Sequence, residues 1–188
     1  VYPFIIVQKG IPVQFTISAS ESAITGCNQT VVFPEYNVQK ALQAGDNLIE
    51  FTPQESGIVS YTCWMGMLDG RILVVDSLEG LADRRTIVIY NEAWHKGVIG
   101  IVASRLTEIY YRPAVVLTRT DNLATGSARS VSGFDVYKAI ENCRDLLENF
   151  GGHTYAAGLS MKVENVEEFT HRFETYVSEH ILPEQTSA

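Results

Sequence analysis

The sequence predicts two domains of different fold class: an all-β antiparallel sandwich over residues 1–79 and an α/β domain with a mixed sheet over residues 80–188. In the first eighty residues, short segments rich in Val, Ile, Thr and aromatic residues recur at roughly even spacing, which is typical of a sandwich or barrel. From Ser77–Gly80 onward, strand-like segments alternate with amphipathic helices, which indicates an α/β layered domain. A chain of 188 residues has room for two such domains.

The first half is expected to consist of strands, apart from one helical turn at Gln39–Leu42. Turn signals such as Gly10–Pro12 and Ala44–Asp46 separate the strands. The chain begins inside what should be the first hairpin, so we expect the sandwich to lack its first strand. A bare sheet edge invites pairing with another chain, which predicts dimerisation through this edge. The expected strands are Ile5–Gln8, Val13–Ser18, Thr30–Phe33, Asn47–Phe51, Ile58–Thr62 and Arg71–Val75.

The second half is expected to follow the order strand, helix, strand, strand, helix, strand, helix. In its second helix, apolar side chains recur at spacings of four, three and four residues, and Gly151 with Gly152 would end that helix. Asn165 is expected to cap the last helix, with Glu168 completing a capping-box-like start. The expected buried face of the last helix is Val166, Phe169, Phe173, Tyr176 and Val177. The other elements are, in order, Thr86–Tyr90, Val98–Ile109, Ala114–Leu117, Ser127–Val131, Phe134–Phe150 and Ala156–Val163.

The net charge of −8 argues against a nucleic-acid-binding protein when the whole chain is considered. The charge is unevenly spread, however. Residues 1–79 hold three basic against eight acidic side chains, giving −5, whereas residues 80–188 hold eleven against fourteen, giving −3. The longest apolar runs, such as Phe4–Val7, are too short to cross a bilayer, so no membrane segment is expected.

Four glycine-containing segments carry the unusual chemistry of the second half, and each falls at an expected strand end or helix start. Backbone amides are free at such places and bind phosphate oxygens well. Arg129 can add a bidentate charge-assisted contact, and Ser127 or Ser130 a neutral donor. Trp94 and His95 offer flat surfaces for an unstacked base. The segments are Trp94–Gly100, Gly126–Ser130, Gly133–Asp135 and Gly151–His153.

Each of these features also has a purely structural interpretation, and the residues alone do not decide between this and a binding role. A glycine-rich turn before a helix is more often a plain connection than an anion site, and a lone histidine such as His153 is more often a turn or surface residue than a ligand. His171 and His180 are expected to be solvated, and Cys143 to be a core residue. The residues alone make the second half a candidate phosphate binder.

Residues 86–182 resemble the domain that follows the DHH phosphoesterase domain in RecJ-type single-strand exonucleases. Several motifs occur in the order typical of that family. The Gly-Gly-His and Ala-Ala-Gly motifs are shared across DHH-family phosphoesterases, whereas the long motif that begins at Trp94 points to the RecJ type. The matching segments are Trp94–Leu106, Arg112-Pro113, Gly126–Ser130, Phe150–His153 and Ala156–Gly158.

This resemblance implies a cytoplasmic accessory domain whose surface holds the backbone of single-stranded DNA. The family's Mn²⁺ or Mg²⁺ ligands are Asp and His residues of the preceding DHH domain, and two-metal phosphodiester chemistry needs such a cluster. No Asp-His-His occurs in this chain, so we expect no catalytic residue, and binding of DNA without cleavage. The residues expected to bind nucleic acid are Trp94, His95, Lys96, Arg105, Ser127, Arg129, Ser130, Gly151, Gly152 and His153.

A sulfur-rich loop, residues 63–67, lies between two expected strands of the first half, and Cys27 lies in an earlier loop. One thiolate and two thioethers within five residues, with a distant cysteine, form a soft-ligand set suited to Cu(I). The candidate metal ligands are Cys27, Cys63, Met65 and Met67. Two other interpretations stay open: Met65 packs in the core beside Trp64, or Cys27 and Cys63 form a plain disulfide.

This half resembles the cupredoxin-like modules found with copper-handling membrane proteins, which implies a Greek-key sandwich and an extracytoplasmic location. Residues 1–79 contain no histidine. A blue-copper electron carrier needs two imidazoles beside its thiolate, so that function is excluded. The matching segments are Gly10–Val13, Gly26–Asn28, Phe51–Pro53, Gly57 and Tyr61–Met67.

Three functions therefore compete. The chain is a nucleic-acid-binding accessory domain of an exonuclease carried with a copper-type sandwich, a Cu(I)-handling module with an α/β passenger, or a structural fusion without activity of its own. The two resemblances imply different compartments, which favours a join between unrelated modules.

Overall fold

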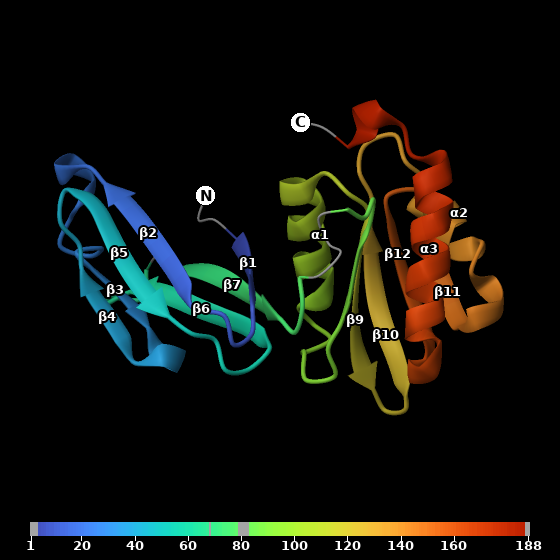
Figure 1. The fold of residues 1–188 in the computed structure, drawn as a ribbon, viewed down its shortest axis with the longest axis horizontal. Coiled ribbons are helices and arrows are strands. Elements are labelled where there is room, and N and C mark those ends of the chain that lie inside the picture. The colour runs from blue at the N-terminus through green and yellow to red at the C-terminus, as the bar shows by residue number, and fades with distance from the viewer. Residues whose placement is uncertain (1–3, 68, 79–82, 187–188) are drawn as a thin grey trace. The chain divides into compact units, whose positions relative to one another are not determined.

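A computed structural model describes residues 4–67, 69–78 and 83–186 of the chain. The chain forms two compact units that divide between Leu78 and Glu79. Figure 1 shows a β-rich N-terminal unit and a C-terminal unit in which helices cover a sheet. The expected boundary at residues 79–80 lies outside the described residues. No helix among the described residues is long and apolar enough to span a membrane.

The N-terminal unit contains two sheets that pack face to face, so the expected sandwich of short strands is confirmed. One sheet has the order β1-β7-β6-β3-β4 and the other pairs β2 with β5. Contrary to the expectation of an antiparallel arrangement throughout, β1 runs parallel to β7. The strands are β1 (Phe4–Gln8), β2 (Val13–Ala19), β3 (Thr30–Phe33), β4 (Val38–Ala41), β5 (Gly45–Phe51), β6 (Gly57–Cys63) and β7 (Asp69–Val75).

The helical turn expected at Gln39–Leu42 is wrong, because these residues form most of β4. Asn37 adopts the left-handed conformation with φ 52° and reverses the chain, so that β4 pairs along the whole of β3. A single helical turn carries the full nucleation cost for few hydrogen bonds, whereas the ladder with β3 satisfies the same backbone groups.

Aromatic rings from both sheets form the centre of this core. Phe33 stacks on Tyr61 with ring centroids 5.1 Å apart, and Phe15 meets Tyr61 at 5.3 Å. A Cβ atom on Gly70 would lie only 2.1 Å from the Tyr61 ring. The glycine in β7 is therefore needed because the neighbouring strand's aromatic ring fills the space of a side chain.

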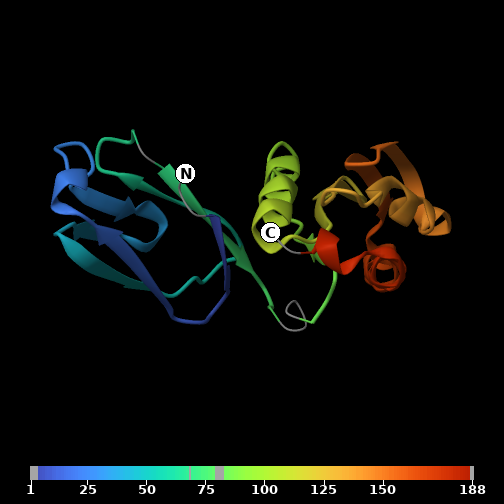
Figure 2. The same cartoon turned by 90° about the horizontal axis from the view of Figure 1, so that it is seen from above.

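The C-terminal unit is built on one five-stranded sheet of order β11-β12-β10-β9-β8, in which β8 and β9 are parallel and the other pairs antiparallel. Helix α1 lies on one face of this sheet and α2 and α3 on the other (Figures 1 and 2). The elements are β8 (Ile87–Tyr90), α1 (Ile99–Tyr110), β9 (Ala114–Thr120), β10 (Leu123–Arg129), α2 (Val136–Glu141), β11 (Leu147–His153), β12 (Ala156–Lys162) and α3 (Val166–His180).

The long helix expected over Phe134–Phe150 is wrong. Helix α2 ends at Glu141, a 3₁₀ turn follows at Arg144–Leu146, and β11 then pairs with β12. Val136, Ile140 and Cys143 are fully buried, so their spacing correctly indicated a core face. Glycine is a poor helix former, and Gly151 and Gly152 belong to the edge strand rather than ending a helix.

The start of α3 also differs from the expected capping box. Asn165 has near-helical dihedral angles and makes no side-chain cap, because a 3₁₀ turn at Val163–Asn165 leads directly into the helix. The side-chain amide of Asn165 donates a hydrogen bond to the Leu146 carbonyl instead. The Glu168 carboxylate accepts a hydrogen bond from Arg172. The expected buried face of α3 is confirmed, with Phe169, Phe173 and Val177 buried and Val166 and Tyr176 packed beside them.

Cys143 is a core residue, as expected. It is fully buried, and burial raises the pKa of its thiol to about 11. The thiol therefore stays protonated at neutral pH, which makes it a poor nucleophile and a poor metal ligand.

The close approach of β11 and β12 at Gly152 provides a stability test. A Cβ atom at this position would lie 2.3 Å from the Ala156 carbonyl oxygen, and its φ is 151°, whereas a Cβ atom at Gly151 meets nothing within 4 Å. We expect Gly152→Ala to lower the free energy of unfolding of this unit by about 1–3 kcal/mol and Gly151→Ala to change it by less than about 0.5 kcal/mol. Urea unfolding followed by Trp94 emission, with Trp64 replaced by Phe in all variants, measures both. Equal midpoints would contradict the steric argument.

Candidate nucleic-acid interface and sulfur loop

On the α1 side of the sheet, α1 packs against β9 and β10, whereas β12 and β11 carry exposed residues such as Gly151, His153 and Gly158. Alternate residues of β10, such as Ala124 and Ala128, point into the core beneath α2 and α3, so the residues between them lie on the α1 side of the sheet. Arg129 pairs with Ala156, which pairs with His153, and Ser127 pairs with Gly158, which pairs with Gly151. We call this surface the open face; it comprises Ser127, Arg129, His153, Gly151, Ala156 and Gly158.

Arg129 is the central cation of the open face. Its Nη1 donates to Ser127 Oγ at 2.7 Å and to the Ala128 carbonyl at 2.8 Å, and its Nε donates to Ser104 Oγ at 3.1 Å. The side chain is half-buried and makes no ion pair with any residue that the structure describes. A partly desolvated guanidinium held by neutral groups attracts an anion from outside.

The N-terminus of α1 adds to this positive potential. The helix begins at Ile99, and its N-cap residue, Val98, offers no side-chain cap, so the first-turn amides are available to an acceptor. A Cβ atom on Gly100 would lie 3.1 Å from Arg129 Nη2 and 3.3 Å from Ser127 Oγ. Gly100 thus lets the guanidinium lie directly against the first turn of the helix.

His153 and Ser130 differ in their hydrogen bonds: Ser130 follows Arg129 in the chain, and His153 lies in the same row as Arg129 on the far side of β12. His153 is exposed, and its Nδ1 accepts a hydrogen bond from the amide of Tyr155 at 3.3 Å, which leaves Nε2 to face a ligand. The Ser130 hydroxyl donates to the Phe134 carbonyl at 2.7 Å, and the Ser130 amide donates to Tyr155. The polar groups of Ser130 therefore hold the turn after β10.

At two positions of the open face, neither packing within the protein nor backbone conformation requires a glycine. A Cβ atom at Gly151 would meet nothing within 4 Å, and one at Gly158 would meet only the Gly126 carbonyl oxygen, at 4.0 Å. Neither glycine adopts a left-handed backbone conformation. They pair across β11 and β12, so a small, exposed shelf lies beside Arg129. Paired strand glycines with free space above them suit the close approach of another backbone.

The sulfur loop is held against the loop that carries Cys27. The Trp64 indole Nε1 donates to the Gly26 carbonyl at 2.9 Å, and Gly66, with φ 68°, closes a turn in which its amide donates to the Cys63 carbonyl. Cys63 is buried, whereas Met65 and Met67 are 50% and 68% exposed. The interpretation that Met65 packs in the core beside Trp64 is therefore wrong, since Trp64 is itself 55% exposed.

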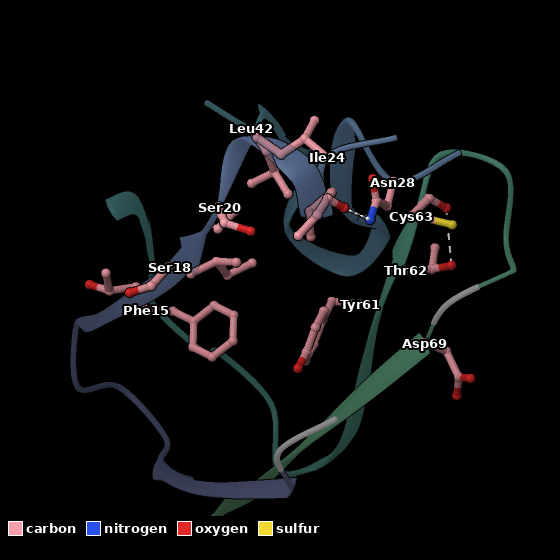
Figure 3. Close-up of a pocket in the computed structure, with 15 residues that line it drawn as sticks. Phe15, Ser18, Ser20, Ile24, Asn28, Leu42, Tyr61, Thr62, Cys63 and Asp69 are labelled. Carbon is pink, nitrogen blue, oxygen red and sulfur yellow. Dashed lines mark hydrogen bonds between the residues drawn. The ribbon is translucent and has the colours of Figure 1, made fainter. Parts of the chain in front are cut away.

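Neither Cys27 nor Cys63 forms a disulfide, so the plain-disulfide interpretation is not supported. Cys63 also borders a largely apolar hollow of about 520 Å³ between β2 and the larger sheet. Figure 3 shows Asn28 and Cys63 at the same end of this hollow. Among the described residues, no three or more His, Cys, Asp or Glu residues are grouped so that they could hold a metal ion. Methionine is not one of these four ligand types.

Comparison with protein families identifies the C-terminal unit. Residues 83–179 match the model of the DHHA1 domain. The chain belongs to the DHHA1 domain family. This DHHA1 domain contains the open face and all five segments that carry the resemblance to RecJ-type exonucleases.

Relatives of known name agree with this assignment. The chain is 40% identical over 126 residues to the single-stranded-DNA-specific exonuclease RecJ of Bacillus subtilis, covering 63% of this chain and 16% of that protein. It is 34% identical over 125 residues to the RecJ of Salmonella typhimurium, covering 63% and 22%. The chain thus spans less than a quarter of the length of these relatives.

Solved structures give the same family. A crystal structure of exonuclease RecJ bound to manganese aligns with a TM-score of 0.51 and 32% identity, covering 56% of this chain and 26% of that one. The metal-binding domain of the Cu(I)-exporting P-type ATPase CopA from Streptococcus pneumoniae, with Cu(I), aligns with a TM-score of 0.35 and 31% identity, covering 37% and 69%.

The remaining residues expected to bind nucleic acid lie around the start of α1. His95 and Lys96 are exposed, and Lys96 makes no ion pair within the described part of the chain. Arg105 pairs with Glu108 at 2.6 Å on the outer side of α1. The expectation of Trp94 as a stacking surface is wrong, because the residue is only 7% exposed. The backbone carbonyl of Trp94 accepts a hydrogen bond from the Thr118 hydroxyl. The indole is part of the fold that positions the loop.

Three residues at or near the open face were not among the residues expected to bind nucleic acid: Ser104, Gly100 and Tyr155. Ser104 supports Arg129, and the helical spacing of four between Gly100 and Ser104 could have placed both on the sheet side of α1. Tyr155, at the β11–β12 hairpin, is 52% exposed. Because β11 was expected to be helical, the hairpin was not recognised.

Proposed function

We propose that the DHHA1 domain of this chain is an accessory domain that binds the phosphate backbone of single-stranded DNA on its open face. The observation that carries the proposal is the half-buried guanidinium of Arg129, which neutral groups hold beside the uncapped start of α1. The named relatives are single-stranded-DNA-specific exonucleases, which supports this choice of ligand.

The mode of binding follows from the geometry. Arg129 and the first-turn amides of α1 bind phosphate oxygens, His153 donates from Nε2, and the shelf at Gly151 and Gly158 admits the sugar-phosphate chain. Contacts of this kind position a strand without selecting its sequence. An overall negative protein can bind in this way because only the few charges near the phosphates contribute strongly at physiological salt.

Hydrolysis would require a metal site that we place outside the matched region. A related RecJ was crystallised with manganese, and the acid and imidazole ligands that bind Mn²⁺ or Mg²⁺ are not clustered among the residues described here. We propose that in longer family members this domain positions the strand while another domain holds the ions.

The guanidinium can be tested by removing its charge. Arg129→Ala is expected to weaken binding of a (dT)12 oligonucleotide about tenfold at low salt, because a charge-assisted contact is lost. The slope of log affinity against log salt should fall by about 0.7. His153→Ala should cause a smaller loss, since it removes one hydrogen bond. Fluorescence anisotropy at several salt concentrations measures both.

The matched control is Lys40→Ala, which makes the same change in net charge from an exposed position of β4 in the other unit. It should leave affinity and salt slope within twofold of wild type. Equal effects of Arg129→Ala and Lys40→Ala would mean that only overall charge matters and would contradict the assignment of the open face.

The shelf predicts a second effect on binding. Gly151→Ala places a methyl group where the strand backbone is proposed to pass, in otherwise open space. We expect it to weaken (dT)12 binding about fivefold, since steric displacement costs about 1 kcal/mol or more, without changing stability. Wild-type affinity in a folded Gly151→Ala variant, measured by the same anisotropy titration, would show that the backbone does not cross the shelf.

We propose Cu(I) as a cargo of the N-terminal unit, a second function that a specific observation favours. The hydrogen bond from Trp64 to Gly26 brings the two sulfur loops together, and neither cysteine is in a disulfide. Cys63 and Met67, with Cys27 as the third donor, form a soft set that fits Cu(I) and not the imidazole-rich Cu(II) sites. We further propose that this unit has the Greek-key arrangement of cupredoxin-like modules. We also propose that the open sheet edge at β2 pairs with a second chain.

The metal proposal is tested with Cu(I) and a competing chelator under reducing, oxygen-free conditions. Wild type should take up one equivalent without blue colour, Cys63→Ser should lose it, and Met67→Leu should weaken it. Cys143→Ala, which removes a buried thiol of the other unit, is the control and should bind normally. Equal stoichiometry in wild type and Cys63→Ser would favour a plain structural role for the sulfur loop.

A further inference from the structure

The hairpin between β11 and β12 is rigidly attached to the rest of the domain. Thr154 and Tyr155 form its two-residue turn between the paired residues His153 and Ala156. The Ser130 amide donates to the Tyr155 carbonyl at 3.0 Å, and the Val136 amide donates to the Thr154 carbonyl at 3.0 Å. Both turn carbonyls are thus tied to the segment between β10 and α2, so the backbone that carries the Tyr155 ring has little freedom.

The Tyr155 side chain is left without a partner by its own domain. The residue is 52% exposed, and its side chain forms no aromatic ring pair and no hydrogen bond with the described residues. Tyr137 and Phe150, by contrast, pack against each other with centroids 5.4 Å apart. A large flat ring on a fixed backbone is costly to expose and is suited to stacking with a ligand.

The position of this ring relates it to the open face. Ala156, the next residue, pairs with both Arg129 and His153, and the Tyr155 amide donates to His153 Nδ1. The ring therefore stands at the end of the strand pair that carries the candidate phosphate ligands. A nucleotide whose phosphate is bound there has its base near the hairpin.

We propose that Tyr155 forms a subsite for one unpaired nucleobase, which stacks on its ring while the open face binds the adjoining phosphate. The inference rests on the proposed function and adds a base-dependent part to it. Because every base has a π-face, the subsite accepts all four bases, and it rejects a base that is paired within a duplex. Tyr155 takes the stacking role that the sequence assigned to Trp94.

The experiment compares (dT)12 with an abasic 12-mer of the same backbone, using the 188-residue chain at one salt concentration. Both probes carry the same phosphates, so their difference isolates the contribution of the bases. Wild type should bind (dT)12 at least about fivefold more tightly than the abasic strand. Tyr155→Ala should abolish this preference without changing affinity for the abasic strand, and Tyr155→Phe should keep the preference, since the ring is retained.

The control variant is Tyr111→Ala, which removes another exposed tyrosine, 40% exposed, from the opposite end of α1; it should behave as wild type. Crosslinking with a 5-iodouracil-substituted strand, mapped by mass spectrometry, should modify the peptide that contains Tyr155. Persistence of the base preference in Tyr155→Ala, or a crosslink mapped to other peptides only, overturns the subsite.

The two probes distinguish failure of the base subsite from failure of the proposed backbone-binding function. Salt-dependent binding that is equal for the two probes in wild type contradicts base stacking and leaves the backbone-binding function intact. Absence of salt-dependent binding of either probe contradicts the proposed function itself, and the base subsite with it.

Discussion

The register of β12 between β10 and β11 places every side chain of the open face. Because Ala156 pairs with both Arg129 and His153, the cation and the imidazole stand in one row across three strands. A shift of one residue would turn these side chains toward the apolar core. The Gly152 position limits such a shift, since the neighbouring backbone occupies the space of a Cβ atom there. The same close contact also sets the hairpin that carries Tyr155.

Local charge pairing separates Arg129 from other cations of this acidic chain. Arg119 pairs with Glu92, and Arg172 pairs with Asp145 and Glu168, so these exposed cations are largely neutralised within the surface. Arg129 differs because serine hydroxyls and a carbonyl hold it. Neutral acceptors fix the geometry of the guanidinium without cancelling its charge. The net charge of −8 therefore says little about this one surface.

Hydrophobic periodicity predicted most elements. The errors occurred where the spacing of apolar residues fits both a helix and a strand. Val136, Ile140 and Cys143 are buried as expected, but the following Leu147 is the first residue of a strand, and its apolar side chain fits either pattern. Of the candidate site, the motifs located Arg129 and His153. They could not reveal that Trp94 is buried, because its burial depends on tertiary packing. They also gave no sign that Ser104, from a helix, supports Arg129 in a strand.

The glycines of the DHHA1 domain differ in whether the protein itself fills the space that a side chain would occupy. At Gly126 and Gly152 the protein itself fills the space of a side chain, with Leu117 in one case and the backbone of β12 in the other. At Gly151 and Gly158 that space is empty, and the backbone conformation is one that other residues adopt easily. Folding alone would allow a side chain at both positions and would favour one, since glycine weakens a strand. We propose that an approaching ligand backbone supplies the missing constraint, and the guanidinium of Arg129 beside the shelf favours an anionic backbone.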